Sequence, residues 1–187
     1  LGGGRRWSLG GVYREGPGFL VRGTTTGQTG GSSAVGGPVQ SVLHVPDVYG
    51  IGVAYSRDEG RTKLALDYDL VRHSQRFDDF VPKDQPDRRD FRIQDAGEIH
   101  FGVEHVFLVI ESQFVGTMRF GVWNEPWHGL EYLGSNAERR QLLPKGGDDT
   151  HWSAGVGLVV KEDYQIDAAL DLSDRVDTVS FSVVRFF

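Results

Sequence analysis

The chain has 187 residues, of which 39% are apolar and 25% charged, with a formal net charge of −6 and no cysteine. The lack of cysteine excludes disulfides, thiolate metal sites and a cysteine nucleophile, and the mild acidity offers no basic surface for nucleic acid. Glycine is frequent, at 26 residues or roughly twice its average share. The longest apolar run, Val106–Ile110, is far shorter than the ~20 residues of a transmembrane helix, but membrane-spanning strands need no such run.

Alternation of apolar and polar residues predicts an all-β chain, because successive side chains of a strand point to opposite faces. In chain order, strands are expected near 6–14, 18–24, 39–57, 61–76, 92–109, 116–124, 150–160, 164–172 and 177–187. Pro46 predicts a bulge or an irregular part in the third of these. Residues 24–38, rich in Gly, Ser and Thr, are expected to form a long loop. No linker or repeat divides residues 1–187, so one domain is expected.

The expected connections alternate in length. Short ones fall near 15–18, 58–60, 110–115 and 161–163, and long ones near 25–38, 77–91 and 125–149. In an up-and-down meander this alternation places the tight turns at one end and the long loops at the other, as in outer-membrane barrels. The connection at 173–176 is the exception, since it is short but falls on the long-loop side.

The two faces of the expected strands differ in chemistry. Along one face of the eight clearer strands, Arg185 is the only Asp, Glu, Lys or Arg. The other face carries many Gly and Ser residues together with charged residues that a barrel would turn toward its lumen: Arg6, Lys63, Asp67, Asp69, Glu98, Glu104, Arg119, Asp167 and Asp171.

Two architectures produce such faces: a soluble β-sandwich with the apolar face inside, and a membrane barrel with the apolar face toward lipid. The barrel is favoured by aromatic residues near the strand ends, by the Gly- and Ser-rich polar face and by the long loops at one end. Arg185 lies close enough to the C-terminal end for its side chain to reach the interface. The predicted fold is therefore an antiparallel up-and-down transmembrane β-barrel.

The C-terminal strand resembles the assembly signal of bacterial outer-membrane barrels, with Phe181, Val183 and Phe187 at alternate positions, although Arg185 stands where an aromatic is usual. Longer stretches are similar to the FadL/TodX family of outer-membrane transporters for long-chain fatty acids and aromatic hydrocarbons. They are Arg6–Arg14, Pro46–Tyr55, Leu64–Asp69, Glu98–Phe107, Met118–Trp123 and Ala168–Asp177.

The resemblance implies a 14-stranded barrel plugged by an N-terminal segment. With about nine expected strands, the chain would be the C-terminal portion of such a barrel, and the hatch and lateral opening of the family would lie upstream of Leu1. A complete eight-stranded barrel with a disordered Gly-rich start is the alternative.

No catalytic residues, cofactor or metal site are expected. His100, His105, His128 and His151 lack the spacing of metal ligands, and no Gly-x-Ser-x-Gly elbow occurs. The carboxylates of the polar face are expected to pair with Arg6, Lys63 and Arg119 rather than to perform acid–base chemistry.

Two connections carry unusual residues. Residues 78–90 hold five Asp with Lys83, Arg88 and Arg89, which predicts a solvated extracellular loop, with binding of divalent cations or lipopolysaccharide phosphates as the alternative. Trp123, Trp127, Leu130 and Tyr132 predict either a first apolar binding site on the cell exterior or a lid on the barrel mouth. Gly146–Asp149 is expected to be a turn.

The function expected from these features and the resemblance is passive transport of hydrophobic small molecules, such as long-chain fatty acids or aromatic hydrocarbons, across the bacterial outer membrane. The protein would be a monomer that contacts membrane lipid and lipopolysaccharide and is inserted by the barrel assembly machinery. A structural or adhesive barrel without transport is the second hypothesis, and a soluble β-sandwich binding module is the third.

Overall fold

The computed structural model describes residues 4–29, 32–110 and 113–186. Its strands are β1 (Arg6–Arg14), β2 (Gly18–Thr29), β3 (Ser32–His44), β4 (Val48–Arg57), β5 (Thr62–Val71), β6 (Phe91–Arg92), β7 (Ala96–Ile110), β8 (Phe114–Glu125), β9 (Glu131–Tyr132), β10 (Asp149–Val160), β11 (Tyr164–Leu172) and β12 (Thr178–Arg185). The short helices are α1 (Phe77–Phe80), α2 (Ala137–Leu142) and the 3-10 turns η1 (Asp58–Gly60), η2 (His73–Arg76) and η3 (Arg88–Asp90). No helix of the described residues is long and apolar enough to cross a membrane.

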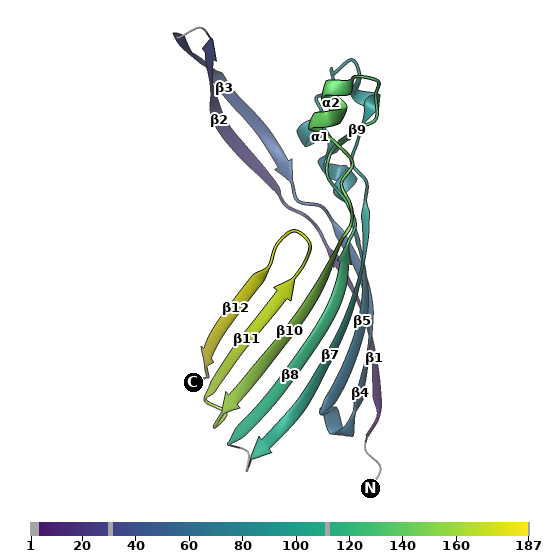
Figure 1. Cartoon of the computed structure of the whole chain (residues 1–187), viewed down its shortest axis with the longest axis vertical. Coiled ribbons are helices and arrows are strands. Elements are labelled where there is room, and N and C mark those ends of the chain that lie inside the picture. Colours follow the sequence, from purple (N-terminus) through teal and green to yellow (C-terminus); the bar gives the residue numbers. More distant parts are fainter. Residues whose placement is uncertain (1–3, 30–31, 111–112, 187) are drawn as a thin grey trace.

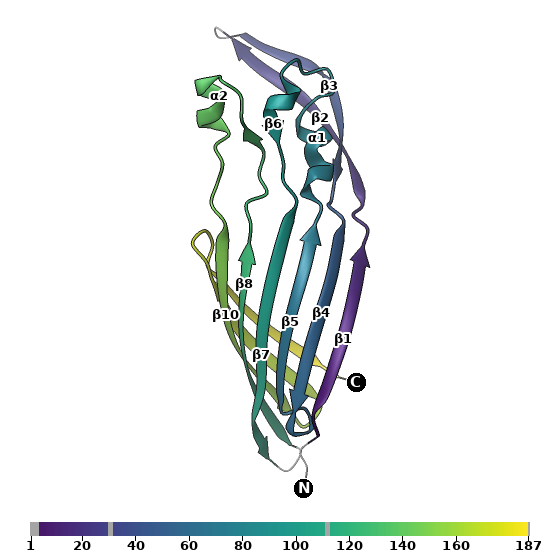
Figure 2. The same ribbon diagram turned by 90° about the vertical axis from the view of Figure 1, so that its right-hand side faces the viewer.

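Eight strands form one antiparallel sheet in the order β1-β4-β5-β7-β8-β10-β11-β12, so each main strand pairs with the next one along the chain. This confirms the all-β, up-and-down prediction. The sheet curves into a trough, with the long connections at one end (Figures 1 and 2). Strands β1 and β12 are its edges, and they do not pair with each other within the described residues, so the sheet is open.

The segment between β1 and β4 differs most from expectation. The strand expected at 39–57 is two strands, β3 and β4, because Val45, Pro46 and Asp47 interrupt the pairing and proline has no N–H to donate. The expected loop at 24–38 is wrong as well, since β2 and β3 pair through it, apart from residues 30–31, which lie outside the described residues. Its Thr and Val residues suit an extended backbone.

The β2–β3 hairpin is not part of the main sheet and projects beyond its end (Figure 1). The Val45 N–H donates to Pro17 O at 3.0 Å and closes the base of the hairpin. The short connection near 15–18 therefore lies at the end with the long loops, which corrects its expected place among the tight turns. Residues 15–47 act as one long connection from β1 to β4.

The connections after β5 (72–95) and after β8 (126–148) pack together, and we call them the cap. Strand β6 pairs with β9 inside it, with Phe91 opposite Tyr132. Of the four buried apolar side chains among the described residues, three belong to the cap (Val81, Ile93 and Tyr132) and the fourth, Ala96, directly follows it. The conventional hydrophobic core of this chain is therefore the cap and not the sheet.

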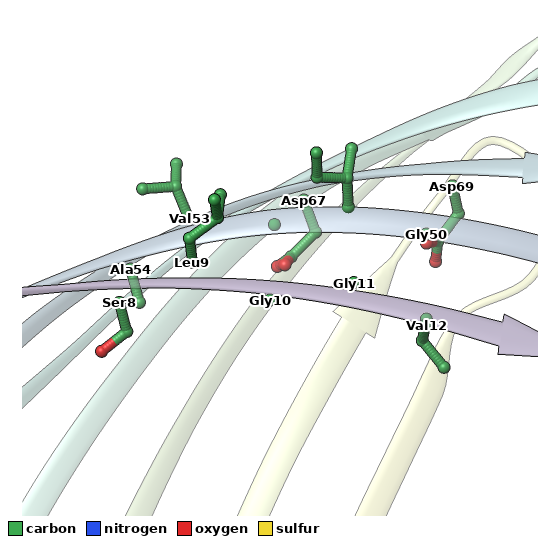
Figure 3. A pocket seen from close by; sticks show the side chains of 12 residues that line it. Ser8, Leu9, Gly10, Gly11, Val12, Gly50, Val53, Ala54, Asp67 and Asp69 are labelled. Carbon is green, nitrogen blue, oxygen red and sulfur yellow. The ribbon is translucent and has the colours of Figure 1, made fainter.

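The convex face of the sheet is apolar and exposed. Leu9 is 78% exposed, Val179 79%, and Trp7 and Phe181 70% each. Figure 3 shows Leu9 and Val53 on this face, whereas Ser8, Asp67 and Asp69 point to the inside of the trough. No second sheet covers the convex face in the described part of the chain, so the arrangement is not that of a β-sandwich.

Two pairs of aromatic side chains on the convex face lie near the opposite ends of β1 and β4. Trp7 packs on Tyr55 with ring centroids 4.8 Å apart at the end of the short turns. Tyr13 packs on Tyr49 at 4.9 Å at the opposite end, beneath the long connections. Tyr13 follows Trp7 by six positions, which is about 20 Å along a strand.

Candidate functional site

The polar residues predicted from alternation lie on the concave face, and four of them form a chain of ion pairs. Lys63 Nζ lies 3.0 Å from Glu104 Oε1, and Arg119 Nε lies 2.9 Å from Glu104 Oε2. Arg119 Nη1 also reaches Asp167 Oδ1 at 2.8 Å. The pairs join β5, β7, β8 and β11, and the Arg119 side chain crosses over β10 to do so.

Glycine makes this crossing possible. A Cβ at Gly157 on β10 would lie 2.6 Å from Asp167 Oδ1 and 2.7 Å from Thr117 Oγ1, in the path of the ion pair. The carboxylate of Asp67 would meet a Cβ at Gly52 in the same way. The high glycine content thus has a structural reason on this face: side chains converge inside a trough, and small residues leave room for their neighbours.

The remaining predicted residues near β1 behave differently. Asp67 and Asp69 line an open hollow of about 460 Å³ together with small residues of β1 and β4 (Figure 3). Arg6, Asp67 and Asp69 form no ion pair with another described residue. Part of the concave face is therefore neutralised by ion pairs, and the part near the β1 edge is not.

A second cluster lies at the cap end of the concave face. The Trp123 ring is stacked on the His151 ring at 3.8 Å and lies 5.4 Å from the His100 ring on its other side. His151 Nδ1 lies 2.7 Å from Asp171 Oδ1, and His100 Nε2 lies 3.4 Å from Glu98 Oε2. Glu98 and Asp171, both predicted on the polar face, thus each have a histidine partner.

His151 also faces two further carboxylates. Its Nε2 atom lies 3.6 Å from Glu125 Oε2 and 3.9 Å from Asp149 Oδ2. One possible metal-binding atom from each of these three residues lies within 4.8 Å of the others. The Asp149 side chain is only 1% exposed, and Arg175 Nε is 3.8 Å from its Oδ2. Sequence spacing did not indicate this group, because its members meet only through the register of β8 and β10.

The four residues of the predicted aromatic loop do not form one surface. Trp123 belongs to β8 and points to the concave side, and Trp127 lies in the cap with the Arg175 guanidinium 5.5 Å from its ring centroid. Tyr132 is buried against Phe91, with ring centroids 5.0 Å apart, and Leu130 is half-buried. These residues contribute to the cap and to the concave site below it.

Three of the five acidic residues of 78–90 form ion pairs. Asp78 pairs with Arg88 and Lys83, Asp79 pairs with His44 of β3, and Asp87 pairs with Arg139 of α2. Hydrogen bonds from Arg88 lower the pKa of Asp78.

Glu131 is buried deeper in the cap. Burial raises the pKa of Glu131. Hydrogen bonds from Arg92 and Gln94 lower this pKa by a larger amount, so it lies below its usual value. The paired carboxylates of Asp78, Asp79, Asp87 and Glu131 thus link separate segments of the cap and its neighbouring hairpin.

The predicted assembly signal lies partly within the described residues. Phe181 and Val183 are exposed on the convex face of β12, and Phe187 lies outside the described residues. The Arg185 guanidinium lies 5.7 Å from the Tyr164 ring centroid.

Comparison of the chain with protein-family models, curated proteins and solved structures gives no match.

Proposed function

We propose that the sheet is the wall of a β-barrel in the bacterial outer membrane, and that the protein carries hydrophobic small molecules across this membrane without energy input or covalent chemistry. The observation that supports the membrane wall best is the inverted polarity of the sheet: apolar side chains are exposed on the convex face and charges lie inside the trough. Monomeric soluble proteins rarely expose continuous apolar patches of more than a few hundred Å².

Three further features support this proposal. The strands of the main sheet have 8 to 15 residues, which brackets the 9–11 or so that a tilted strand needs to cross a bilayer. The two aromatic pairs near the ends of β1 and β4 match the position of the interfacial girdles in such barrels. Strands β1 and β12 are unpaired edges, and closure of the barrel requires them to pair with each other or with other strands.

The transport part of the proposal rests on the resemblance of six sequence stretches to the FadL/TodX transporters, with long-chain fatty acids or aromatic hydrocarbons as the substrate class. The cap would meet these molecules outside the cell, because it lies at the end with the long connections and exposes the apolar side chains of Phe80, Leu133 and Leu142 (Figure 2). Membrane lipid, lipopolysaccharide and the barrel assembly machinery are the proposed partners of a monomer.

Uptake of a labelled long-chain fatty acid and of a labelled alkylbenzene tests transport in a strain that lacks the protein. We expect uptake of at least one of them to fall, and to return when the protein is supplied again. Heat-modified migration in gels checks that the supplied protein is present as a folded barrel. A labelled sugar is the control, and its uptake should not change. Unchanged uptake of both hydrophobic compounds contradicts transport and favours a structural or adhesive barrel.

A further inference from the structure

We propose that Glu125, Asp149 and His151 form a binding site for a divalent first-row transition metal such as Zn²⁺, with Asp171 orienting the histidine. The ligands come from the ends of two paired strands. Asp149 is directly opposite Glu125 in the register of β10 and β8, and His151 follows Asp149 by two residues and so lies on the same face. The site does not depend on the proposed transport.

The contact with Asp171 leaves the other ring nitrogen of His151, Nε2, facing Glu125 and Asp149. His151 Nδ1 lies 2.7 Å from Asp171 Oδ1, so the proton of the neutral ring is on Nδ1 and the lone pair of Nε2 is free to bind a metal. A carboxylate that accepts from the second nitrogen of a metal-bound histidine is a recurrent arrangement in metal sites. The stacked Trp123 ring at 3.8 Å further fixes the plane of the imidazole.

Two buried atoms point to a missing partner. Asp149 Oδ2 and His151 Nε2 have no hydrogen-bond partner among the described residues, although the Asp149 side chain is 1% exposed and that of His151 12%. A buried polar atom without a partner is costly, so such atoms in a folded protein call for an explanation. A cation between them satisfies both atoms at once.

The distances suit a small cation better than direct hydrogen bonds. The separations of 3.6 and 3.9 Å from His151 Nε2 to the two carboxylate oxygens are too long for hydrogen bonds. Nitrogen and oxygen ligands about 2.1 Å from a tetrahedral zinc ion lie about 3.4 Å from each other. Small rotations of the Glu125 and Asp149 side chains bring these atoms into that geometry.

The local charge agrees with a divalent ion. The carboxylates of Glu125, Asp149 and Asp171 surround His151, which binds a metal through an unprotonated nitrogen and then carries no charge, and Arg175 is the cation near Asp149. Their formal charges leave −2 to be balanced, which one divalent ion does. The nitrogen ligand favours Zn²⁺ or a similar transition metal over Ca²⁺ and Mg²⁺, which prefer oxygen ligands alone.

Calorimetric titration of the whole untagged protein in detergent with ZnCl₂ tests the site. We expect one equivalent of Zn²⁺ per chain, with Ca²⁺ binding more weakly. Glu125→Gln and His151→Gln should each weaken binding at least 100-fold, and Asp171→Asn by about 10- to 100-fold, as for other residues that orient metal ligands. Asp149→Asn is less suitable, because Asp149 Oδ1 also accepts the Asp174 N–H at 3.1 Å, so this substitution changes a structural contact as well as a metal ligand.

Glu138→Gln on the exposed face of α2 and His105→Gln on β7 are the matched controls, because they make the same chemical changes outside the cluster. Both should bind Zn²⁺ as the unchanged protein does. Far-UV circular dichroism of each variant separates loss of ligands from loss of folding. The proposal is overturned if the protein takes up no Zn²⁺, if Ca²⁺ binds more tightly, or if correctly folded Glu125→Gln and His151→Gln proteins bind as tightly as the controls.

Titration with Co²⁺ tests the position of the bound ion independently. The ion would sit next to the imidazole on which Trp123 is stacked, so its binding should quench the fluorescence of Trp123. A Trp123→Phe protein should lose most of the quenching but keep Co²⁺ binding. Quenching of equal size in Trp123→Phe places the ion elsewhere and contradicts the proposed site.

Discussion

The sheet and the cap turn opposite kinds of residue inward. In the cap, Val81, Ile93 and Tyr132 are inside, and charged residues such as Arg139 and Asp87 pair around them. In the sheet, Trp7 and Phe181 are exposed on the convex face, while Arg119 and Glu104 lie inside the trough. The cap thus places apolar residues inside and charged residues outside, as domains surrounded by water do. The sheet has the inverse arrangement.

Because of this difference, the exposed surfaces of the two regions suit different solvents. The cap gains stability from removing apolar area from water, as soluble domains do. The sheet leaves that area exposed, and its hydrogen bonds between strands are the main contacts of the described residues within it. The proposed membrane around the convex face would resolve the contrast, and the following experiments test it.

The largest effect is expected from a charge on the convex face. Phe181→Arg should destabilise the protein in lipid vesicles by about 2–4 kcal/mol, because it places a cation in the hydrocarbon layer. Ser180→Arg is the matched control, since Ser180 is the preceding residue, is also exposed and lies on the opposite face. It should change stability by less than about 0.5 kcal/mol. Equal free energies of unfolding for the two variants, measured with urea, contradict the inverted polarity of the sheet.

A smaller effect concerns the cap alone and depends on pH. Burial and the nearby His128 ring, stacked at 4.0 Å, lower the pKa of His73 from 6.5 to about 4. Between these two values the unfolded cap takes up a proton that the folded cap excludes, so cap stability should fall as pH falls from about 6.5 to about 4. The loss is at most about 3 kcal/mol.

Amide hydrogen exchange of Val81 and Leu133, whose N–H groups bond within the cap, measures this loss. Faster exchange at pH 5 than at pH 7, after correction for intrinsic rates, is the expected result. His73→Gln should remove most of the pH dependence. A cap equally stable at both pH values shows that His73 is not kept neutral by its surroundings.

The smallest effect is expected from filling a glycine position on the concave face. Gly157→Ala places a methyl group in the path of the Arg119–Asp167 ion pair and should cost about 1–2 kcal/mol. Gly10→Ala is the control on the same face, because no atom lies within 4 Å of the added carbon. If urea unfolding shows the same stability for both, the concave glycines do not serve to make room for charged neighbours.

Much of the sheet was predictable from the sequence, because alternation is a local signal. Arg119 and Glu104 each alternate with apolar neighbours, and this pattern alone assigns them to the polar face. The hairpin of β2 and β3 was not predictable in the same way. Its Gly, Ser and Thr residues are typical of loops, and only pairing between its two halves makes them strands.

The candidate site was predicted in part. The ion pairs of Lys63 and Arg119 follow from shared faces, whereas Arg6, which was also expected to pair with a carboxylate of this face, forms no ion pair with a described residue. The cluster around His151 was missed because Gly146–Asp149 resembles a turn, whereas Asp149 begins β10. Its position opposite Glu125 depends on strand register, which single-sequence patterns do not contain.

The four tryptophans of the chain allow the most direct test of the contrast between sheet and cap. Trp7 and Trp152 are exposed on the convex face, whereas Trp123 points into the trough and Trp127 lies in the cap. Proteins that keep one tryptophan each, inserted into vesicles with brominated acyl chains, report which rings touch lipid. We predict strong quenching of Trp7 and Trp152 and little quenching of Trp123 and Trp127. Equal quenching of all four, or none for Trp7 and Trp152, contradicts a lipid-facing convex surface.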